Sequence, residues 1–399
     1  MKCRVCDSNN LLPAIDLGIQ PWCNNFLSQD EVGKEPFYPL RVIHCQACHT
    51  AQLDYTVKKE VMFADHTYLS GVTQTLSNHF KDIAYDIDAR YFRNLKNKSV
   101  LDIGSNDGTQ LKHFQSLGYD VVGVESSKGT ADIANSAGIP TINAFFNEAV
   151  VIEIGQKFDV INASGVFFHL EELHSVCRAI KRGLNSNGIF VVQFLYMKSI
   201  IDNLAFDQIY HEHLLYYTLK TIQTLLDRHG LAMFDASLSR IHGGSIIGHI
   251  THKEAKRPKT KAMQHLENLE FLSSVNDYQT YLTFARAVEV MKIKNLEYLH
   301  SRRNACKKIY GMGAPVKGNT LLNYFDIGVE LIDCLVEKNS LRRGTFSPGK
   351  HIPIIIEDEL QDIPDVYYVL AWNFKNEILH NHKELIQKGV EFYFPVNPQ

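Results

Sequence analysis

The segment from Phe206 to His213, FDQIYHEH, holds the densest run of acid and base side chains in the sequence. Tyr210, Glu212 and His213 can each move a proton or stabilise an oxyanion, and the ordinary pKa of histidine suits a base at neutral pH. Two other interpretations stay open. His211 and His213 would share a face of an extended segment and could bind a metal, or the histidines are only hydrogen-bonded core residues.

A second segment that could take part in chemistry is the stretch from Val100 to Gly108, VLDIGSNDG. An apolar strand runs into a glycine turn and then a helix, which is typical of a nucleotide-type cofactor loop. Asn106 replaces the middle glycine of a dinucleotide loop, so a pyrophosphate ligand is disfavoured. S-adenosylmethionine (SAM) has no phosphate and needs only close backbone approach and an acid near its amino group. An ordinary strand turn that happens to carry Gly and Asp is the alternative.

The predicted cofactor residues lie on the first three strands of this pattern and their turns. Glu125 ends the strand VVGVE roughly twenty residues after the first glycine, the usual spacing for a carboxylate that holds ribose hydroxyls. The full predicted set is Asp102, Gly104, Asn106, Gly108, Glu125 and Phe145.

Two CxxC pairs near the N-terminus, Cys3 with Cys6 and Cys45 with Cys48, predict one zinc ion. Four thiolates complete a tetrahedron and leave no position for water, so the metal is expected to be structural. A redox dithiol needs a single CxxC at a helix start, and that context is missing here.

These residues must be positioned by an α/β framework. From Ser99 onward, strand and helix patterns alternate, which predicts a doubly wound parallel sheet. Two later β-runs, LAMFDASLSRI and SIIGHITH, are close enough to pair as a hairpin. A helix is expected from about Leu76, and one long helix from Phe271 to Lys294 is expected to precede a second, smaller α/β domain.

Composition limits the possible function classes. The chain has 399 residues, 45% of them hydrophobic, and a net charge of −3, so packed cores are expected and nucleic acid is an unexpected partner. No secretion signal and no run of 18 apolar residues is visible, which predicts a cytoplasmic protein without a membrane partner.

Several motifs together resemble the zinc-containing sugar C-methyltransferases, enzymes that make branched deoxysugars. They are the two CxxC pairs with a QPxxN element, a Tyr-x-Ser segment, DIGSNDG, FDQIYHEH, HGGS, the loop GxGAPxKGN and a late LAWN. The match runs in order from Cys3 to Asn373. FDQIYHEH and the GxGAPxKGN loop are its most specific parts.

The resemblance implies three domains. They are an N-terminal zinc-binding module (residues 1–66), a class I methyltransferase domain ending in an antiparallel hairpin (67–252) and a C-terminal Rossmann-like domain that binds a sugar nucleotide (253–399). The implied substrate is a nucleotide-linked 4-keto-6-deoxy sugar, methylated at C3. A base removes the C3 proton, which the neighbouring carbonyl acidifies, and the carbanion attacks the methyl group of SAM.

By position, the resemblance makes His213 the base, with Glu212 and Tyr210 beside it, and places Tyr68 in the site. The implied substrate-binding residues are His169, His242, Ser245, Lys317 and Asn319, the last two as diphosphate ligands. The sequence departs from the family pattern at Gln193 and Glu337, so the sugar and its nucleotide, thymidine or guanosine diphosphate, stay open.

Two other functions compete with this interpretation. An O- or N-methyltransferase would need no base for a carbon acid, and FDQIYHEH would then be incidental. A non-catalytic zinc-bearing assembly protein would not need the intact set of Asp102, Gly104, Gly108 and Glu125.

Overall fold

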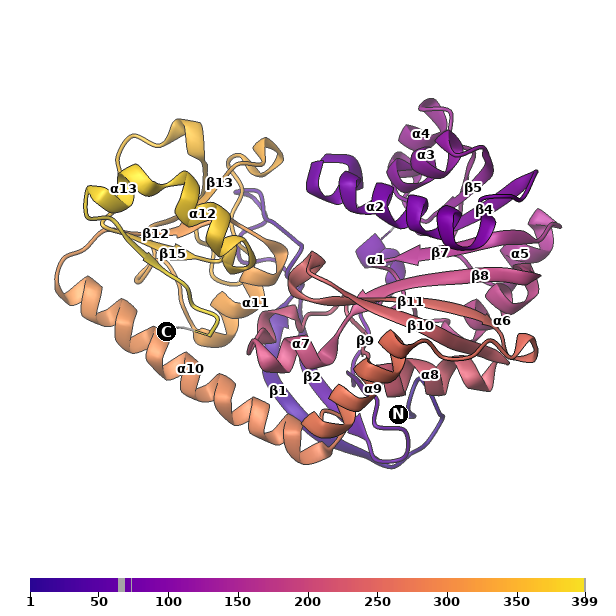
Figure 1. Ribbon diagram of the computed structural model, residues 1–399. Coiled ribbons are helices and arrows are strands. Elements are labelled where there is room, and N and C mark those ends of the chain that lie inside the picture. The colour runs from indigo at the N-terminus through magenta and orange to yellow at the C-terminus, as the bar shows by residue number, and fades with distance from the viewer. Residues whose placement is uncertain (64–68, 73, 398–399) are drawn as a thin grey trace.

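The computed structural model describes residues 1–63, 69–72 and 74–397, and this part of the chain forms three β-sheets (Figure 1). The N-terminal sheet is antiparallel, in the order β1-β2-β3-β9. Its strands are β1 (Leu11–Pro21), β2 (Phe37–Cys45), β3 (Ala51–Leu53) and β9 (Leu215–Tyr216). The last strand comes from the middle of the chain and pairs with β3.

The central sheet has the order β10-β11-β8-β7-β4-β5-β6. Strands β4 to β8 are parallel to one another, and β11 pairs antiparallel both with β8 and with the edge strand β10. The predicted doubly wound fold with an antiparallel hairpin at its end is therefore confirmed. The strands are β4 (Lys98–Ile103), β5 (Tyr119–Glu125), β6 (Thr141–Asn143), β7 (Phe158–Ser164), β8 (Leu184–Leu195), β10 (Leu231–Ser239) and β11 (Ser245–His252).

Helices cover both faces of this sheet, as alternating strand and helix patterns require. One face packs against α2 (Gln74–Ile87), α3 (Thr109–Ser116) and α4 (Lys128–Ser136). The other packs against α5 (Glu148–Ile154), α6 (Leu173–Gly183) and α8 (Leu219–Arg228). The carboxyl ends of the parallel strands therefore form an edge where a ligand can lie between covered faces.

The C-terminal sheet is parallel, in the order β14-β13-β12-β15-β16. Its strands are β12 (Ile309–Met312), β13 (Cys334–Glu337), β14 (Ile354–Ile356), β15 (Val366–Val369) and β16 (Glu391–Tyr393). Helices α10 (Tyr278–Asn304) and α11 (Val316–Phe325) cover one face, and α12 (Lys375–Asn381) and α13 (Lys383–Gln387) cover the other.

The prediction of one long helix from Phe271 is wrong. The structure has two helices, α9 (Lys261–Ser273) and α10, separated at Ser274, whose φ of 52° ends α9 in a left-handed conformation. Asn276, in the break, accepts a hydrogen bond of 2.6 Å from the Thr218 hydroxyl. A tertiary contact therefore interrupts a segment whose local pattern favours a continuous helix.

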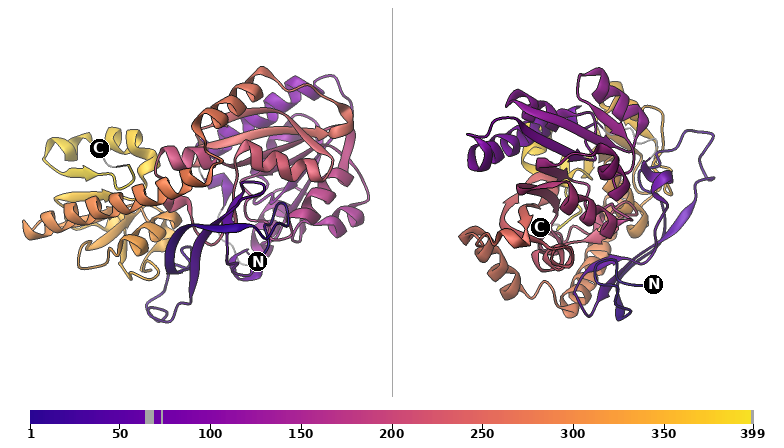
Figure 2. Two further views of the ribbon diagram at one scale, coloured as in Figure 1. Left: turned by 90° about the horizontal axis from the view of Figure 1, so that it is seen from below. Right: turned by 90° about the vertical axis from the view of Figure 1, so that its right-hand side faces the viewer.

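One continuous hydrophobic core links the three sheets. It includes Leu40 of the N-terminal sheet, Phe190 of the central sheet and Leu335 of the C-terminal sheet. The strands β1 and β2 lie at the junction of the two larger domains, where β1 contacts α10 and α11 (Figure 2). The outer domains are thus packed on the central one, and the limits predicted for the three domains stay a prediction.

No described helix is both long enough and apolar enough to cross a bilayer.

Candidate active site

The cofactor loop follows β4 and depends on two glycines with positive φ. Gly104 has φ 66°, and a Cβ there would lie 2.5 Å from Cγ2 of Val166. Gly108 has φ 75° and caps the start of α3, where a Cβ would lie 3.0 Å from Ile139. Both positions therefore require glycine, and Gly104 brings the loop against the turn that follows β7.

Two buried carboxylates flank this loop. Glu125, at the end of β5, accepts hydrogen bonds from the backbone N–H groups of Asn106 (3.0 Å) and Ser127 (2.8 Å). Asp102, on β4, is 3% exposed and accepts a bond of 2.6 Å from Asn162. Burial raises the pKa of Asp102 to about 7, and the charge of Glu125 acts in the same direction.

This donor and acceptor set fits SAM. The carboxylate of Glu125 retains lone pairs for ribose hydroxyls, because a carboxylate can accept about four hydrogen bonds. Asp102 is an acid whose ionised form a cationic ligand would stabilise.

Two other predicted cofactor residues have partners of their own. The side-chain oxygen of Asn106 accepts from the N–H groups of Asp107 (2.9 Å) and of Ser70 (2.8 Å) in η1 (Ser70–Val72). Phe145 is half-buried after β6, with the Lys59 ammonium 4.7 Å from its ring centre. Asn106 thus joins the loop to the segment before α2.

The predicted base, His213, lies in the loop after η3 (Phe206–Gln208) and is buried. Its Nδ1 lies 2.7 Å from the carbonyl oxygen of Gln208. Because a carbonyl can only accept, Nδ1 carries the hydrogen, and in the neutral ring the basic lone pair is on Nε2. The ring packs 3.8 Å from the ring of Tyr210 and 4.7 Å from that of Phe168.

His169 lies beside His213, with their ring centres 5.2 Å apart. Its Nδ1 is 2.6 Å from the carbonyl oxygen of Glu212, so the same reasoning gives His169 a basic Nε2. Val166, which contacts Gly104, lies three residues before His169 on the same turn. The turn that carries His169 therefore borders the cofactor loop, and His213 adjoins His169.

The carboxylate of Glu212 is bonded by two side chains of the N-terminal domain. It accepts a bond of 2.8 Å from the indole N–H of Trp22 and another from the side chain of Asn24. Burial raises the pKa of Glu212 to about 7, although these two donors lower it. Burial and the charge of Glu212 raise the pKa of Tyr210 well above its ordinary value, so its hydroxyl keeps its proton at neutral pH.

The alternative metal site at His211 and His213 is not supported. The segment turns, with the His213 N–H bonded to the Tyr210 carbonyl at 2.9 Å, so the two rings have different neighbours. The His211 ring lies 5.7 Å from that of Tyr38, and burial lowers the pKa of His211 to about 4.

The C-terminal domain brings a cation, Lys317, to the segment that carries the predicted base. The Lys317 ammonium lies 3.8 Å from the ring centre of Trp372 and 3.8 Å from the buried carboxylate of Asp207. The Trp372 indole donates to that carboxylate at 2.6 Å. Burial lowers the pKa of Lys317, while Asp207 favours its charged form.

Asn319, the other predicted diphosphate ligand, bonds to the N-terminal domain. It is 1% exposed and its side-chain nitrogen donates to the carbonyl of Cys23 at 2.7 Å. This buried amide contributes to the domain interface, and a role of Lys317 and Asn319 as diphosphate ligands stays a prediction.

Three further residues complete the predicted set: Ser245, His242 and Tyr68. Ser245 is buried at the start of β11 and its hydroxyl accepts from Gln193 at 2.9 Å. The backbone of His242 lies in η4 (Ile241–Gly243), but its side chain is outside the described part of the structure. Tyr68 is outside the described residues altogether.

The four predicted zinc ligands come together. The sulfur atoms of Cys3, Cys6, Cys45 and Cys48 all lie within 4.8 Å of one another. The shortest separations, 3.5 Å and 3.6 Å, are far too long for a disulfide and close to the ~3.8 Å that a tetrahedron of Zn–S bonds requires. Within the described ranges this is the one cluster of possible ligands that fits a metal ion, and it fits one structural zinc.

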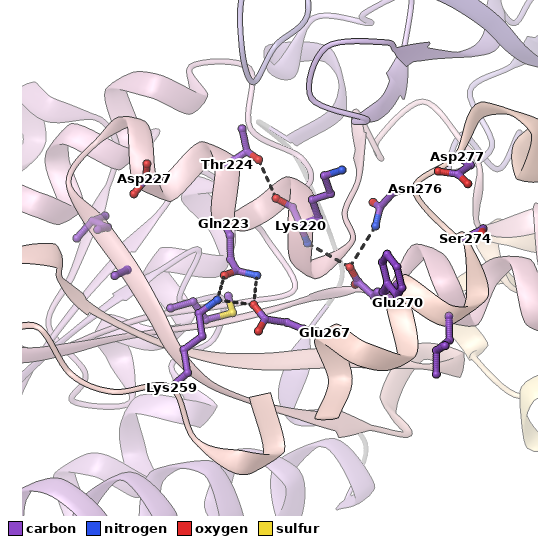
Figure 3. A pocket seen from close by; sticks show the side chains of 15 residues that line it. Lys220, Gln223, Thr224, Asp227, Lys259, Glu267, Glu270, Ser274, Asn276 and Asp277 are labelled. Carbon is purple, nitrogen blue, oxygen red and sulfur yellow. Dashed lines mark hydrogen bonds and ion pairs between the residues drawn. The ribbon is translucent and has the colours of Figure 1, made fainter. Parts of the chain in front are cut away.

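A separate pocket of about 930 Å³ lies between α8, α9 and β10 (Figure 3). Its polar side chains pair with one another: Lys259 and Gln223 bond to Glu267, and Glu270 accepts from the first N–H groups of α8. The residues that line this pocket include none of the glycine loop and none of the segment from Phe206 to His213, so the carboxyl edge of the central sheet is the better candidate site.

Three residues of the site were not predicted from the sequence: Trp22, Asp207 and Trp372. Each was visible inside a noted motif, QPWCNN, FDQIYHEH or LAWN. Their partners lie 165 and 190 residues away in the chain, so no local pattern could pair them.

Comparisons with known proteins match each part of the chain. Residues 3–63 match a family model described as a zinc binding domain, residues 77–235 one described as a methyltransferase domain, and residues 240–397 one described as a C-methyltransferase C-terminal domain. The C-methyltransferase NovU of Streptomyces niveus is 30% identical over 400 residues, which cover 99% of this chain and 95% of NovU.

Other relatives match part of the chain. A ubiquinone biosynthesis O-methyltransferase of Azorhizobium caulinodans is 30% identical over 131 residues, 32% of this chain and 50% of that protein. Among solved structures, a SAM-dependent methyltransferase from Clostridium acetobutylicum has a TM-score of 0.37 at 14% identity, covering 49% of this chain and 95% of its own. Magnesium protoporphyrin IX methyltransferase from Synechocystis has a TM-score of 0.34 at 14% identity, covering 44% and 79%.

Proposed function

The chain belongs to the zinc-containing, SAM-dependent C-methyltransferases, and on that premise we propose that it methylates C3 of a nucleotide-linked 4-keto-6-deoxy sugar through an enolate. The observation that carries this proposal is the orientation of His213. Its Nδ1 hydrogen is held by the Gln208 carbonyl, which leaves Nε2 as the base. A carbon acid needs such a base, whereas an oxygen nucleophile can react without one.

In this proposal, His213 Nε2 removes the C3 proton and Tyr210 donates a hydrogen bond to the enolate oxygen. Tyr210 can take this role because its hydroxyl stays protonated at neutral pH. His169, whose ring adjoins that of His213, would contact the sugar. Lys317 would bind the diphosphate as a point charge at the first turn of α11.

Asp102 and Glu125 would hold the cofactor by its amino group and its ribose. When bound, SAM supplies the electrophilic methyl group. The four cysteines hold a structural metal ion with no open position, so the metal supports the fold of the N-terminal module and takes no part in the chemistry.

The test identifies the product by NMR after the full-length enzyme is incubated with SAM and a 4-keto-6-deoxyglucose linked to thymidine diphosphate or to guanosine diphosphate. We expect NMR to show a new methyl group bonded to carbon, with loss of the H3 signal. A methyl carbon with the chemical shift of a methoxy group, and an intact H3 signal, would contradict carbon methylation.

A further inference from the structure

The chain has two tryptophans, and both bond to the segment that carries the proposed base. Trp22 follows β1 of the N-terminal sheet and donates its indole N–H to Glu212 at 2.8 Å. Trp372, in η8 (Trp372–Phe374) of the C-terminal domain, donates to Asp207 at 2.6 Å. The segment from Asp207 to Glu212 is therefore held at both ends by indole groups from the two flanking domains.

Because both carboxylates are buried, loss of either indole donor would be costly. Asp207 is fully buried and Glu212 is 5% exposed, and a buried carboxylate that loses a donor carries an uncompensated desolvation penalty. Oδ1 of Asp207 lacks a hydrogen-bond partner, and at Oδ2 the indole of Trp372 adds a direct hydrogen bond to the longer-range charge of Lys317 at 3.8 Å.

The same short segment sets the geometry of both histidine rings. The carbonyl of Gln208, next to Asp207, holds Nδ1 of His213. The carbonyl of Glu212 holds Nδ1 of His169. A displacement of either carboxylate would therefore move a carbonyl that fixes an imidazole ring, and misplacement of a base by about 1 Å can cost on the order of 100-fold in rate.

We infer that Trp22 and Trp372 are positioning residues for the methyl-transfer site, acting through Glu212 and Asp207 on the rings of His213 and His169. This role rests on the proposed function for its effect on catalysis. It gives the zinc-binding module a part in the site beyond its own folding, because Trp22 directly follows Pro21, the last residue of a strand whose other end pairs with Cys45.

The loop that carries Trp22 is itself well fixed. The carbonyl of Cys23 accepts from Asn319, and Leu27 exchanges backbone hydrogen bonds with Phe346 at 3.0 and 2.8 Å. These contacts tie the loop to the C-terminal domain as well, so the position of the Trp22 indole is fixed by two domains.

The first experiment replaces Trp22 with Phe, which keeps an aromatic ring and removes the donor. We expect kcat with the sugar nucleotide to fall on the order of ten-fold while KM for SAM stays within about two-fold, since the cofactor loop is untouched. Tyr278→Phe is the matched control. It removes a hydrogen bond of 2.6 Å to Pro13 on β1, the strand that precedes Trp22, and should leave kcat unchanged because neither residue bonds to the segment from Asp207 to His213.

A double-mutant cycle tests whether Trp22 acts through Glu212. If it does, Trp22→Phe in a Glu212→Gln background should add little to the effect of Glu212→Gln alone. The corresponding pair is Trp372→Phe with Asp207→Asn. Fully additive losses in both cycles would overturn the inference.

A third readout needs no substrate. The ring signals of His169 and His213, assigned in histidine-labelled enzyme from His→Asn variants, should shift in Trp22→Phe and in Asn24→Ala, and not in Tyr278→Phe. Asn24→Ala removes the second donor to Glu212 and serves if Trp22→Phe does not fold. Shifted signals without carbon methylation would contradict the proposed function and support the positioning role; unmoved signals would overturn the positioning role.

Discussion

The glycine loops of the central and C-terminal domains have the same backbone architecture. In each, the N–H of a left-handed glycine, Gly104 or Gly313, bonds at 2.8 Å to the carbonyl of the residue that precedes a glutamate on the next strand. That glutamate, Glu125 or Glu337, then accepts from a backbone N–H of the loop, at 3.0 Å in the first case and 2.8 Å in the second.

The two loops differ in charge. Asp102 lies two residues before Gly104, whereas Gly311 lies at the corresponding position before Gly313. The second loop instead carries Lys317 in the first turn of its helix. A cationic cofactor suits the first loop and the proposed diphosphate suits the second, so the same backbone arrangement would bind ligands of opposite charge through a few different side chains.

The largest expected effect comes from the proposed base, whose loss should abolish catalysis and leave ligand binding at both loops intact. His213→Asn keeps much of the shape of the side chain but cannot accept a proton, so methyl transfer should fall about 1,000-fold or more. Calorimetry should still show binding of SAM at one loop and of thymidine diphosphate at the other. Near-normal turnover would make another group, His169 first, the base.

Glycine substitutions should affect the two ligands separately. Gly104→Ala forces a Cβ onto Val166 at a φ of 66° and should weaken SAM binding on the order of 100-fold. Gly313 has φ 81°, and a Cβ there would lie 3.1 Å from Cβ of Ala371, so Gly313→Ala should weaken binding of thymidine diphosphate by a comparable factor. If either change weakened both ligands equally, the loops would not be independent sites.

The glutamates test whether the parallel extends to ligand contacts. Glu125→Ala should weaken SAM by about 1.5 to 3 kcal/mol, through lost hydrogen bonds to ribose hydroxyls. Glu337→Ala should weaken binding of the nucleoside diphosphate and leave binding of SAM unchanged. Unchanged nucleotide affinity in Glu337→Ala would restrict that glutamate to holding the loop.

The smallest effect is a pH dependence. Because the pKa of Asp102 is raised to about 7 and a cation favours its ionised form, SAM affinity should rise about ten-fold from pH 6 to pH 8. Asp102→Asn should flatten the part of the profile that belongs to Asp102. The amino group of SAM titrates in both proteins and so serves as the internal reference.

Sequence patterns predicted the central sheet well because each strand and helix carries its own apolar periodicity, as β4 and α2 do. The break at Ser274 was missed because it depends on a contact from Thr218 to the neighbouring Asn276. The cysteine cluster was predictable from spacing alone. The orientation of Asn319 and the role of Trp22 were not, since each depends on a partner from another domain.

The two-residue strand β9 has a consequence for how the protein is made. The N-terminal sheet lacks its fourth strand until Leu215 and Tyr216 leave the ribosome, long after β3 has emerged. The free edge of β3 is exposed during that interval and is open to wrong pairing. The N-terminal module therefore completes its sheet only after most of the central domain has been synthesised, and a transplanted copy would have to include residues 215–216.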